Sequence, residues 1–357
     1  MRECILLTGG AGFIGSALSR KIGDDELDIV AIDSFLEQVH PTGARPEFLH
    51  ERVIVLKADI REEETWKALL AEYKPVKIVH LAAETGTAQS LTEATRHASV
   101  NVVGTARMLE ALAQTGTRPE RIVLASSRAV YGEGMWRDEA GVGFYPGPRT
   151  HAMLSAGQWS PRTINGGEAF PLPHDAATVV PQPTSIYGAT KLAQENVLAA
   201  WCASFGVPLS ILRLQNVYGE GQSPYNPYTG IINIFHRLAK AGHAIPVYED
   251  GNIIRDFIHV DDVVEVIYRI LSCESAGNHK IDVGSGIPIT IHEAARIIAR
   301  LHGAPEPVVC GKFREGDVRA AVAHVGAMKA LTGVCATVSF QEGVARVGIW
   351  LEQRGYL

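Results

Sequence analysis

Short apolar runs alternate with longer segments of helical periodicity from the first residues onward. This alternation is typical of βαβ units around a parallel sheet, and several runs are apolar throughout, as in strands that helices cover on both faces. The pattern predicts strands near residues 3–8, 28–32, 53–57, 77–81, 121–125 and 208–213, and helices near 12–22, 62–73, 91–114 and 185–205. We therefore expect an α/β fold with a doubly wound parallel sheet.

The pattern changes between residues 134 and 183, where prolines alternate with glycines and with Trp136 and Trp159. A loop of this length within a compact domain is usually functional or disordered, and its aromatic residues favour an ordered one. After residue 213 the periodicity becomes less regular, as in a mixed region that ends in a segment at 340–351. We expect residues 1–216 to form one domain that contains the insertion 134–183. Residues 217–357 should form mainly a smaller mixed domain, with about 256–285 returning to the first.

Composition excludes several classes of protein. The 357 residues carry a formal net charge of -6, so there is no basic field for nucleic-acid binding, and any anionic ligand needs local cations. The five cysteines include no CxxC pair, which argues against a disulfide framework and against a zinc site. No run approaches the ~18 apolar residues of a membrane span, and the N-terminus lacks a signal-peptide core. We expect a cytoplasmic protein with no membrane partner.

Residues that could suggest a metal site have simpler explanations. Asp261 and Asp262 are adjacent, but no third ligand lies at a useful spacing, so helix capping and structural pairing explain them better. His80 and His259 are expected to be core or strand histidines. The sequence therefore predicts no metal.

A glycine-rich loop follows the first predicted strand. Residues 8–15 read TGGAGFIG and place Gly9, Gly12 and Gly15 where a helix should open. Such glycines permit a sharp turn, close approach to a pyrophosphate and close packing of helix on strand, and the helix N-terminus attracts the anion. Asp33 ends the second predicted strand, where a carboxylate can bind both ribose hydroxyls and repel a 2'-phosphate. The combination predicts NAD rather than NADP; the alternative is a tight structural turn with Asp33 as a strand-end cap.

A second constellation predicts proton transfer. Tyr187 and Lys191 lie four residues apart on one predicted helix, so they share a face. A neighbouring lysine cation is expected to lower the pKa of a phenol from about 10 towards neutrality. Ser127 follows the fifth predicted strand, at the sheet edge where open α/β folds bind ligands, although a plain strand-end serine is an alternative.

Together, TGGAGFIG, Asp33, Ser127, YGATK (187–191) and RDFIHVDD (255–262) resemble the extended short-chain dehydrogenase/reductase family, in particular its NAD-dependent nucleotide-sugar epimerases and dehydratases. The resemblance covers nearly the whole chain. It implies a Rossmann sheet with a smaller substrate-binding domain, and it assigns catalysis to Ser127, Tyr187 and Lys191. The resemblance and the glycine-rich loop together imply a set of NAD contacts. They are Gly9, Gly12, Phe13, Ile14, Gly15, Asp33, Ser34, Asp59, Ile60, Leu81, Ala82, Ala83, Asn101, Ser126, Tyr187 and Lys191.

The resemblance also implies a substrate site for a dTDP- or UDP-sugar. Its expected residues are Glu84, Ser127, Arg128, Tyr187, Asn216, Arg255 and Arg314, of which the arginines suit bidentate phosphate contacts. Asp59 and Ile60 could frame the adenine, although a helix N-cap explains Asp59 equally well. Residues 134–137 and 149–159 of the insertion either close over the sugar as a lid or form a surface embellishment or subunit contact.

The residues after Ser127 narrow the reaction. In the 4,6-dehydratases of the family an Asp-Glu pair follows this serine, whereas Arg128 and Ala129 stand here and neither can act as acid or base. Oxidation and reduction at one carbon remain, and the NAD preference implied by Asp33 favours an epimerase over an NAD(P)H-dependent 4-keto-sugar reductase. A non-catalytic NAD-sensing protein is less favoured, because Tyr187 and Lys191 are both present.

The expected reaction is inversion at C4 of a nucleotide sugar through a transient 4-keto sugar. Including the insertion, the pattern is most similar to the dTDP-L-rhamnose 4-epimerase group, which makes 6-deoxy-L-talose nucleotides. That group implies a place in deoxysugar and cell-surface polysaccharide biosynthesis. The family also implies a homodimer formed through the helices predicted at 91–114 and 185–205.

Overall fold

A seven-stranded parallel sheet organises the chain in the computed structural model, which describes residues 1–226, 230–273 and 277–357. The strand order is β13-β9-β5-β4-β1-β2-β3. The strands are β1 (Arg2–Thr8), β2 (Asp28–Asp33), β3 (Ile54–Lys57), β4 (Tyr73–His80), β5 (Arg121–Ser127), β9 (Leu209–Leu214) and β13 (His279–Val283). The order reverses between β1 and β4, which creates a crevice at the carboxyl ends of the strands. The predicted doubly wound fold is confirmed.

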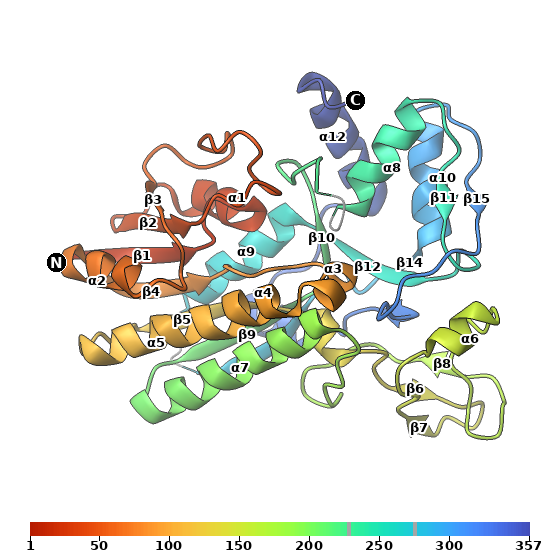
Figure 1. The fold of residues 1–357 in the computed structure, drawn as a ribbon, viewed down its shortest axis with the longest axis horizontal. Helices are drawn as coiled ribbons and strands as arrows, with labels where there is room; N and C mark the ends of the chain where they lie inside the picture. Colours follow the sequence, from red (N-terminus) through yellow and green to blue (C-terminus); the bar gives the residue numbers. More distant parts are fainter. Residues whose placement is uncertain (227–229, 274–276) are drawn as a thin grey trace.

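Helices cover both faces of this sheet, as Figure 1 shows. The helices are α1 (Phe13–Ile22), α9 (Val260–Leu271) and α11 (Gly326–Thr332) on one face, and α2 (Glu63–Glu72), α5 (Thr105–Gln114) and α7 (Ile186–Phe205) on the other. Successive residues of a strand point to opposite faces. Accordingly Leu7 of β1 packs in the first core and Leu6 in the second.

The prediction of one continuous helix at 91–114 is wrong. The chain forms α3 (Thr87–Thr92), α4 (Ala94–Ala98), a π-helical segment (Ser99–Gly104) and then α5. The wider π turn contains the buried Asn101, whose amide donates to the carbonyl of Glu84 and to Thr190 Oγ1. Because these partners are distant in sequence, hydrophobic periodicity could not reveal the break. π-Helical segments often lie at functional sites.

Strand β4 begins at Tyr73, four residues before the predicted position. Pro75 lies inside it, at a register shift in the pairing with β1 between Cys4 and Ile5. The pairing of β4 with β5 starts only at Lys77, so Pro75 removes no hydrogen bond on that side. A proline is tolerated in a strand at such an irregularity.

The C-terminal part builds a second, smaller layer around its own core. One sheet contains β10 (Asn216–Tyr218), β12 (Ile254–His259), β14 (Pro288–Thr290) and β16 (Ala320–Ala321), and β11 (Pro246–Val247) pairs with β15 (Val308–Val309). The helices are α8 (Ile231–Lys240), α10 (Ile291–Leu301) and α12 (Phe340–Gln353). Between β12 and β13 the chain returns to the large sheet, where α9 packs beside α1.

The insertion forms a small projection at one end of the molecule (Figure 1). It contains the three-stranded sheet β7-β6-β8, with β6 (Trp136–Arg137), β7 (Gly143–Phe144) and β8 (Phe170–Pro171), and the short helix α6 (His151–Ser155). Among the described residues, no helix is long and apolar enough to cross a bilayer.

Candidate active site

A cavity of about 690 Å³ opens at the carboxyl ends of the sheet strands. Its wall combines the glycine loop, the end of β5, the start of α7 and segments of the C-terminal part. The predicted site residues on this wall are Gly9, Gly12, Phe13, Ile14, Gly15, Leu81, Ala83, Ser126, Ser127, Arg128, Tyr187, Lys191, Asn216, Arg255 and Arg314. Predicted cofactor-binding residues and predicted substrate-binding residues therefore line the same cavity.

The glycine loop fits the pyrophosphate of a dinucleotide. Gly9 has a φ of +65°, and a Cβ there would lie 2.8 Å from the backbone of Ala82. A Cβ on Gly15 would lie 2.5 Å from the carbonyl oxygen of Gly10. Gly12 caps α1 with no side-chain hydrogen bond, which leaves the first backbone N–H groups of the helix for an anion.

Asp33 ties the end of β2 to this loop. Its Oδ2 accepts a hydrogen bond from the Ala11 N–H at 3.1 Å, and its Oδ1 accepts one from Phe35 N–H at 2.9 Å. The side chain is mostly buried. A carboxylate fixed beside the glycine loop is the arrangement that binds an adenosine ribose.

Seven predicted site residues are not part of the cavity wall, namely Asp33, Ser34, Asp59, Ile60, Ala82, Glu84 and Asn101. Asp59 is paired with Arg61 at 2.5 Å, and Ile60 is buried in the core beside α2. The carboxylate of Glu84 is bound to Arg96 of α4 at 2.8 Å. Glu84 does not line the cavity in this arrangement, and its expected contact with the sugar stays a prediction.

Ser127 and Tyr187 both lie on the wall of the cavity, close enough to interact. Ser127 ends β5, and its Oγ accepts from the N–H of Ala129 at 3.1 Å. Tyr187 lies in the first turn of α7, whose N-cap Ser185 accepts from Gly188 N–H. Burial raises the pKa of the Tyr187 phenol, whereas the hydrogen bond with Ser127 and the charge of Arg128 lower it.

Lys191 bonds to Gln194 in this arrangement. The prediction made it the cation that lowers the Tyr187 pKa, but its ammonium donates to Gln194 Oε1 and is almost fully buried. Burial lowers the pKa of Lys191 itself to about 7. In this arrangement Arg128 is the cation whose charge lowers the Tyr187 pKa, and the expected role of Lys191 beside Tyr187 stays a prediction.

A buried polar chain behind Lys191 was not predicted. The Gln194 amide donates to His80 Nε2 at 3.0 Å and to Thr105 Oγ1 at 2.9 Å. His80 Nδ1 lies 2.6 Å from Thr8 Oγ1, and burial lowers the His80 pKa to about 3, so its ring is neutral. His80 is a core histidine, as expected. The spacing of Gln194, one turn after Lys191, is the signal that could have found it.

A second unpredicted network supports Ser126. Glu195 accepts from Ser126 Oγ at 2.5 Å and from Arg213 at 3.0 and 2.8 Å. The Arg213 guanidinium lies 4.6 Å from the centre of the Tyr131 ring, whose hydroxyl donates to Asp282 at 2.8 Å. These pairs lock the ends of β5, β9 and β13 together under the cavity.

Cations and amides also line the cavity wall. Arg128 Nε donates to Asn216 Oδ1 at 2.9 Å, and burial with repulsion from Arg255 lowers the Arg128 pKa to about 10. Arg255 is paired with Asp317 at 2.6 Å, and Arg314 lies over the ring of Tyr248. Three predicted substrate cations therefore face one cavity.

Gln215 adds an unpredicted polar group to this wall. It is 5% exposed, and among the described residues neither atom of its side-chain amide has a hydrogen-bond partner. Buried amides are rarely left unpaired in the absence of a ligand.

The acids and histidine near the start of α9 have structural roles. His259 caps the helix by accepting from Asp261 N–H, and Asp262 accepts from Thr337. His259 also contacts Glu220 at 2.9 Å. Among the described residues, no group of three or more His, Cys, Asp or Glu side chains is arranged to hold a metal ion.

The insertion does not line the cavity. None of residues 134–183 belongs to its wall, so of the two alternatives for the insertion the structure gives no support to a lid over the sugar. Trp136 is buried with its Nε1 donating to the carbonyl of Glu133, and Arg149 is buried in an ion-pair cluster. The side chains of Trp136 and Arg149 instead bind Glu133, and Arg149 also binds Glu249, so both help to attach the insertion to the rest of the protein.

Comparisons with known proteins show the family to which the chain belongs. Residues 6–138 match the family model described as GDP-mannose 4,6 dehydratase, and residues 160–284 match the NAD dependent epimerase/dehydratase family. A dTDP-L-rhamnose 4-epimerase from Burkholderia thailandensis is 48% identical over 353 residues, which cover 98% of this chain and 95% of that protein.

Solved structures show the same relationship. The UDP-glucose 4-epimerase of Thermotoga maritima with UDP-glucose superimposes with a TM-score of 0.79 at 26% identity, covering 98% of this chain and 99% of that one. The Thermus thermophilus UDP-glucose 4-epimerase in complex with NAD gives a TM-score of 0.76 at 27% identity, covering 99% and 100%.

The fold and the site define an NAD-dependent enzyme of the short-chain dehydrogenase/reductase type. The chain belongs to the NAD-dependent epimerase/dehydratase family. The predictions of a nucleotide-sugar epimerase and of NAD as its cofactor are confirmed by this membership.

Proposed function

We propose that this chain is an NAD-dependent nucleotide-sugar 4-epimerase that interconverts dTDP-L-rhamnose and dTDP-6-deoxy-L-talose. The observation that carries the proposal is the placement of Tyr187 and Ser127 in one cavity with the glycine loop, with Arg128 and Ala129 where a dehydratase would need acids. The relative at 48% identity supports the choice of sugar nucleotide.

The site residues suit NAD. The close backbone approach at Gly9 and Gly15, the uncapped start of α1 and the fixed carboxylate of Asp33 would hold its pyrophosphate and adenosine ribose. When bound, NAD supplies the acceptor for the C4 hydride and, once reduced, the donor that returns it. Lys191 would turn from Gln194 to reach the nicotinamide ribose.

Tyr187 is the proton-transfer group in this proposal. Its phenolate removes the proton of the sugar 4-hydroxyl, and the resulting phenol returns that proton after inversion. Ser127, which interacts with the Tyr187 phenol, would hold the same oxygen and keep it in line. The Arg128 charge favours the phenolate, because an adjacent cation stabilises the ionised form.

The substrate diphosphate needs cations, and Arg128, Arg255 and Arg314 supply them from the cavity wall. Asn216 accepts from Arg128 and fixes its direction. Between the two half-reactions the 4-keto sugar must present its other face, and the 690 Å³ cavity gives it room while these cations retain the diphosphate.

We propose a homodimer for the assembled enzyme. The exposed apolar side chains of Leu91 on α3, Val103 in the π-helical segment and Phe205 on α7 support contact through these helices. A cytoplasmic location is proposed as well, because all five cysteines are free thiols.

The test uses purified protein with dTDP-L-rhamnose in D₂O and no added cofactor. We expect NMR to show inversion at C4 with protium retained there, because the hydride never exchanges with solvent. Tyr187→Phe should abolish the reaction, whereas Tyr268→Phe on α9, away from the cavity, should not. A stoichiometric requirement for NADPH would instead establish a reductase, and bound NAD without turnover would establish a sensing protein.

A further inference from the structure

The insertion makes many of its contacts with one strip of the C-terminal part, residues 313–324. Its His174 forms a parallel bridge with Ala323, with the His174 N–H donating to Val322 O at 2.7 Å. Arg319 donates to Ser160 Oγ at 3.1 Å. This strip begins next to Arg314, a proposed diphosphate ligand, and includes Asp317, the partner of Arg255.

Arg149 is the centre of this attachment. Its side chain is 1% exposed and is bound to two carboxylates, Glu133 at 2.8 Å and Glu249 at 2.8 Å. It also donates to the carbonyls of Trp159 at 3.0 Å and Asp317 at 2.9 Å. The Arg149 guanidinium therefore connects the insertion to Glu133, which follows β5, and to two segments of the C-terminal part, at Glu249 and Asp317.

Two of these partners lie on the cavity wall. Glu249 and Asp317 line the cavity. Glu249 has a φ of +53°, a backbone conformation that is strained for a non-glycine residue and persists only when its surroundings hold it. Arg149 and Arg319 both bind its carboxylate, and its neighbour Tyr248 carries Arg314 over its ring.

A second layer of contacts holds the start of the strip. The rings of His151 and Trp159 pack against Phe313, with centroid distances of 5.6 and 6.2 Å. His151 Nδ1 lies 2.5 Å from Glu315 Oε1. Arg314 therefore lies between Phe313 and Glu315 in the chain, and side chains of the insertion contact both of these residues.

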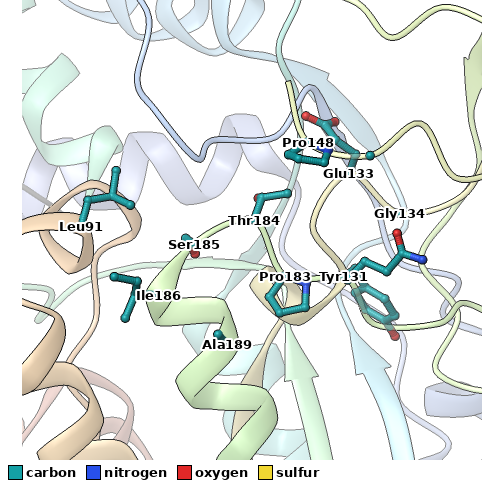
Figure 2. Close-up of a pocket in the computed structure, with 12 residues that line it drawn as sticks. Leu91, Tyr131, Glu133, Gly134, Pro148, Pro183, Thr184, Ser185, Ile186 and Ala189 are labelled. Carbon is teal, nitrogen blue, oxygen red and sulfur yellow. The ribbon is translucent and has the colours of Figure 1, made fainter. Parts of the chain in front are cut away.

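The opposite side of the insertion is open. A separate cavity of about 520 Å³ lies between it and the start of α7, with Leu91 of α3 on one side and Glu133, Gly134 and Pro148 on the other (Figure 2). This cavity lies on the α7 side of the insertion, whereas an ion pair and a hydrogen bond of Arg149 connect the insertion to Glu249 and to the 313–324 strip.

We propose that Arg149 is a positioning residue for the substrate diphosphate. From the insertion, it fixes the Tyr248–Glu249 turn and the 314–317 segment that present Arg314 and the Asp317–Arg255 pair to the cavity. The insertion thereby controls substrate affinity without contacting the sugar. This inference rests on the proposed use of the cavity for a nucleotide sugar.

The test measures binding and turnover in Arg149→Lys and Arg149→Met, with Arg162→Met as the control. Arg162 lies on the surface of the same insertion, and within the described part of the chain its side chain makes a single hydrogen bond, to the carbonyl of Gly166. We expect the Kd for dTDP, by calorimetry, and the KM for the sugar nucleotide to rise at least about tenfold in both Arg149 variants. The kcat at saturation and the NAD content should change little, because Arg149 contacts neither Tyr187 nor the glycine loop. Arg162→Met should match the wild type.

The result that overturns the inference is a folded Arg149 variant with an unchanged Kd for dTDP. If both variants fail to fold, Phe313→Ala decides the matter, since this residue is only partly buried: a weaker Kd supports the positioning role, and an unchanged Kd overturns it. A wild type that binds dTDP but does not epimerise would refute the proposed function alone. A wild type that binds neither dTDP nor UDP would refute the positioning role.

Discussion

Lys191 is expected to reduce the stability of the folded protein, and the reduction should depend on pH. Burial lowers its pKa to about 7 from 10.5, so the folded state holds this proton less tightly than the unfolded chain does. The charged lysine therefore destabilises the fold wherever the unfolded chain is protonated. The penalty is fully present below pH 7 and disappears as the pH rises towards 10.5. At about 1.4 kcal/mol per pKa unit, it reaches about 5 kcal/mol.

Lys191→Met keeps an unbranched chain of similar length and removes the charge. It also leaves Gln194 Oε1 without its donor, at a cost of about 1–3 kcal/mol. We expect the variant to be more stable than the wild type by about 2–4 kcal/mol at pH 6, and this advantage should shrink by about 3 kcal/mol at pH 9.

Urea unfolding of NAD-free protein at pH 6 and pH 9 measures this difference, because every other titrating group is common to both chains. The exposed Lys329→Met is the control and should stay within about 0.5 kcal/mol of the wild type at both pH values. An advantage of Lys191→Met that is the same at pH 6 and pH 9 would refute the reasoning.

Three further predictions concern the wall of the cavity and its support. Gly15→Ala places a Cβ 2.5 Å from the carbonyl oxygen of Gly10, so the purified protein should retain less than about a tenth of its NAD, as measured in the denatured supernatant. Glu195→Gln leaves the buried Arg213 without its counter-charge and should lower the free energy of unfolding in urea by about 3–5 kcal/mol. Gln215→Leu removes an amide that has no partner among the described residues. It should raise the KM for the sugar nucleotide roughly tenfold without loss of folding stability, and an unchanged KM would exclude a ligand contact.

The sheet could be predicted from sequence because its signal is local. In a run such as residues 3–8, apolar side chains point to both faces of the strand. In the structure, Leu6 and Leu7 pack into the two cores on opposite faces of the sheet. The break in the helix predicted at 91–114 could not be predicted in the same way. It is set by Asn101, whose partner Thr190 lies 89 residues further along the chain.

The site shows the same division. The glycine loop, Ser127 and Tyr187 are placed by short motifs at the ends of strands and the start of a helix, and the structure brings them to one cavity. The electrostatics depend on contacts that no motif encodes. Lys191 was expected to act on Tyr187; in this arrangement it bonds Gln194, and Arg128 is the cation whose charge lowers the Tyr187 pKa. Arg149 lies in a loop rich in proline and glycine, so from sequence alone it could not be distinguished from an exposed charged residue.

The position after Ser127 is where the dehydratases and this chain diverge, even though residues 6–138 match a family model described as a dehydratase. A carboxylic acid there would donate a proton to a departing hydroxyl. Arg128 cannot do so; its charge, fixed by Asn216, lowers the pKa of the Tyr187 phenol. Removal of a proton from a sugar hydroxyl needs a phenolate, and a fixed cation favours that form. The residue that replaces the acid for dehydration therefore also opposes the rise in the Tyr187 pKa that burial causes, so more of the phenol is ionised, and both effects favour oxidation at C4 over dehydration.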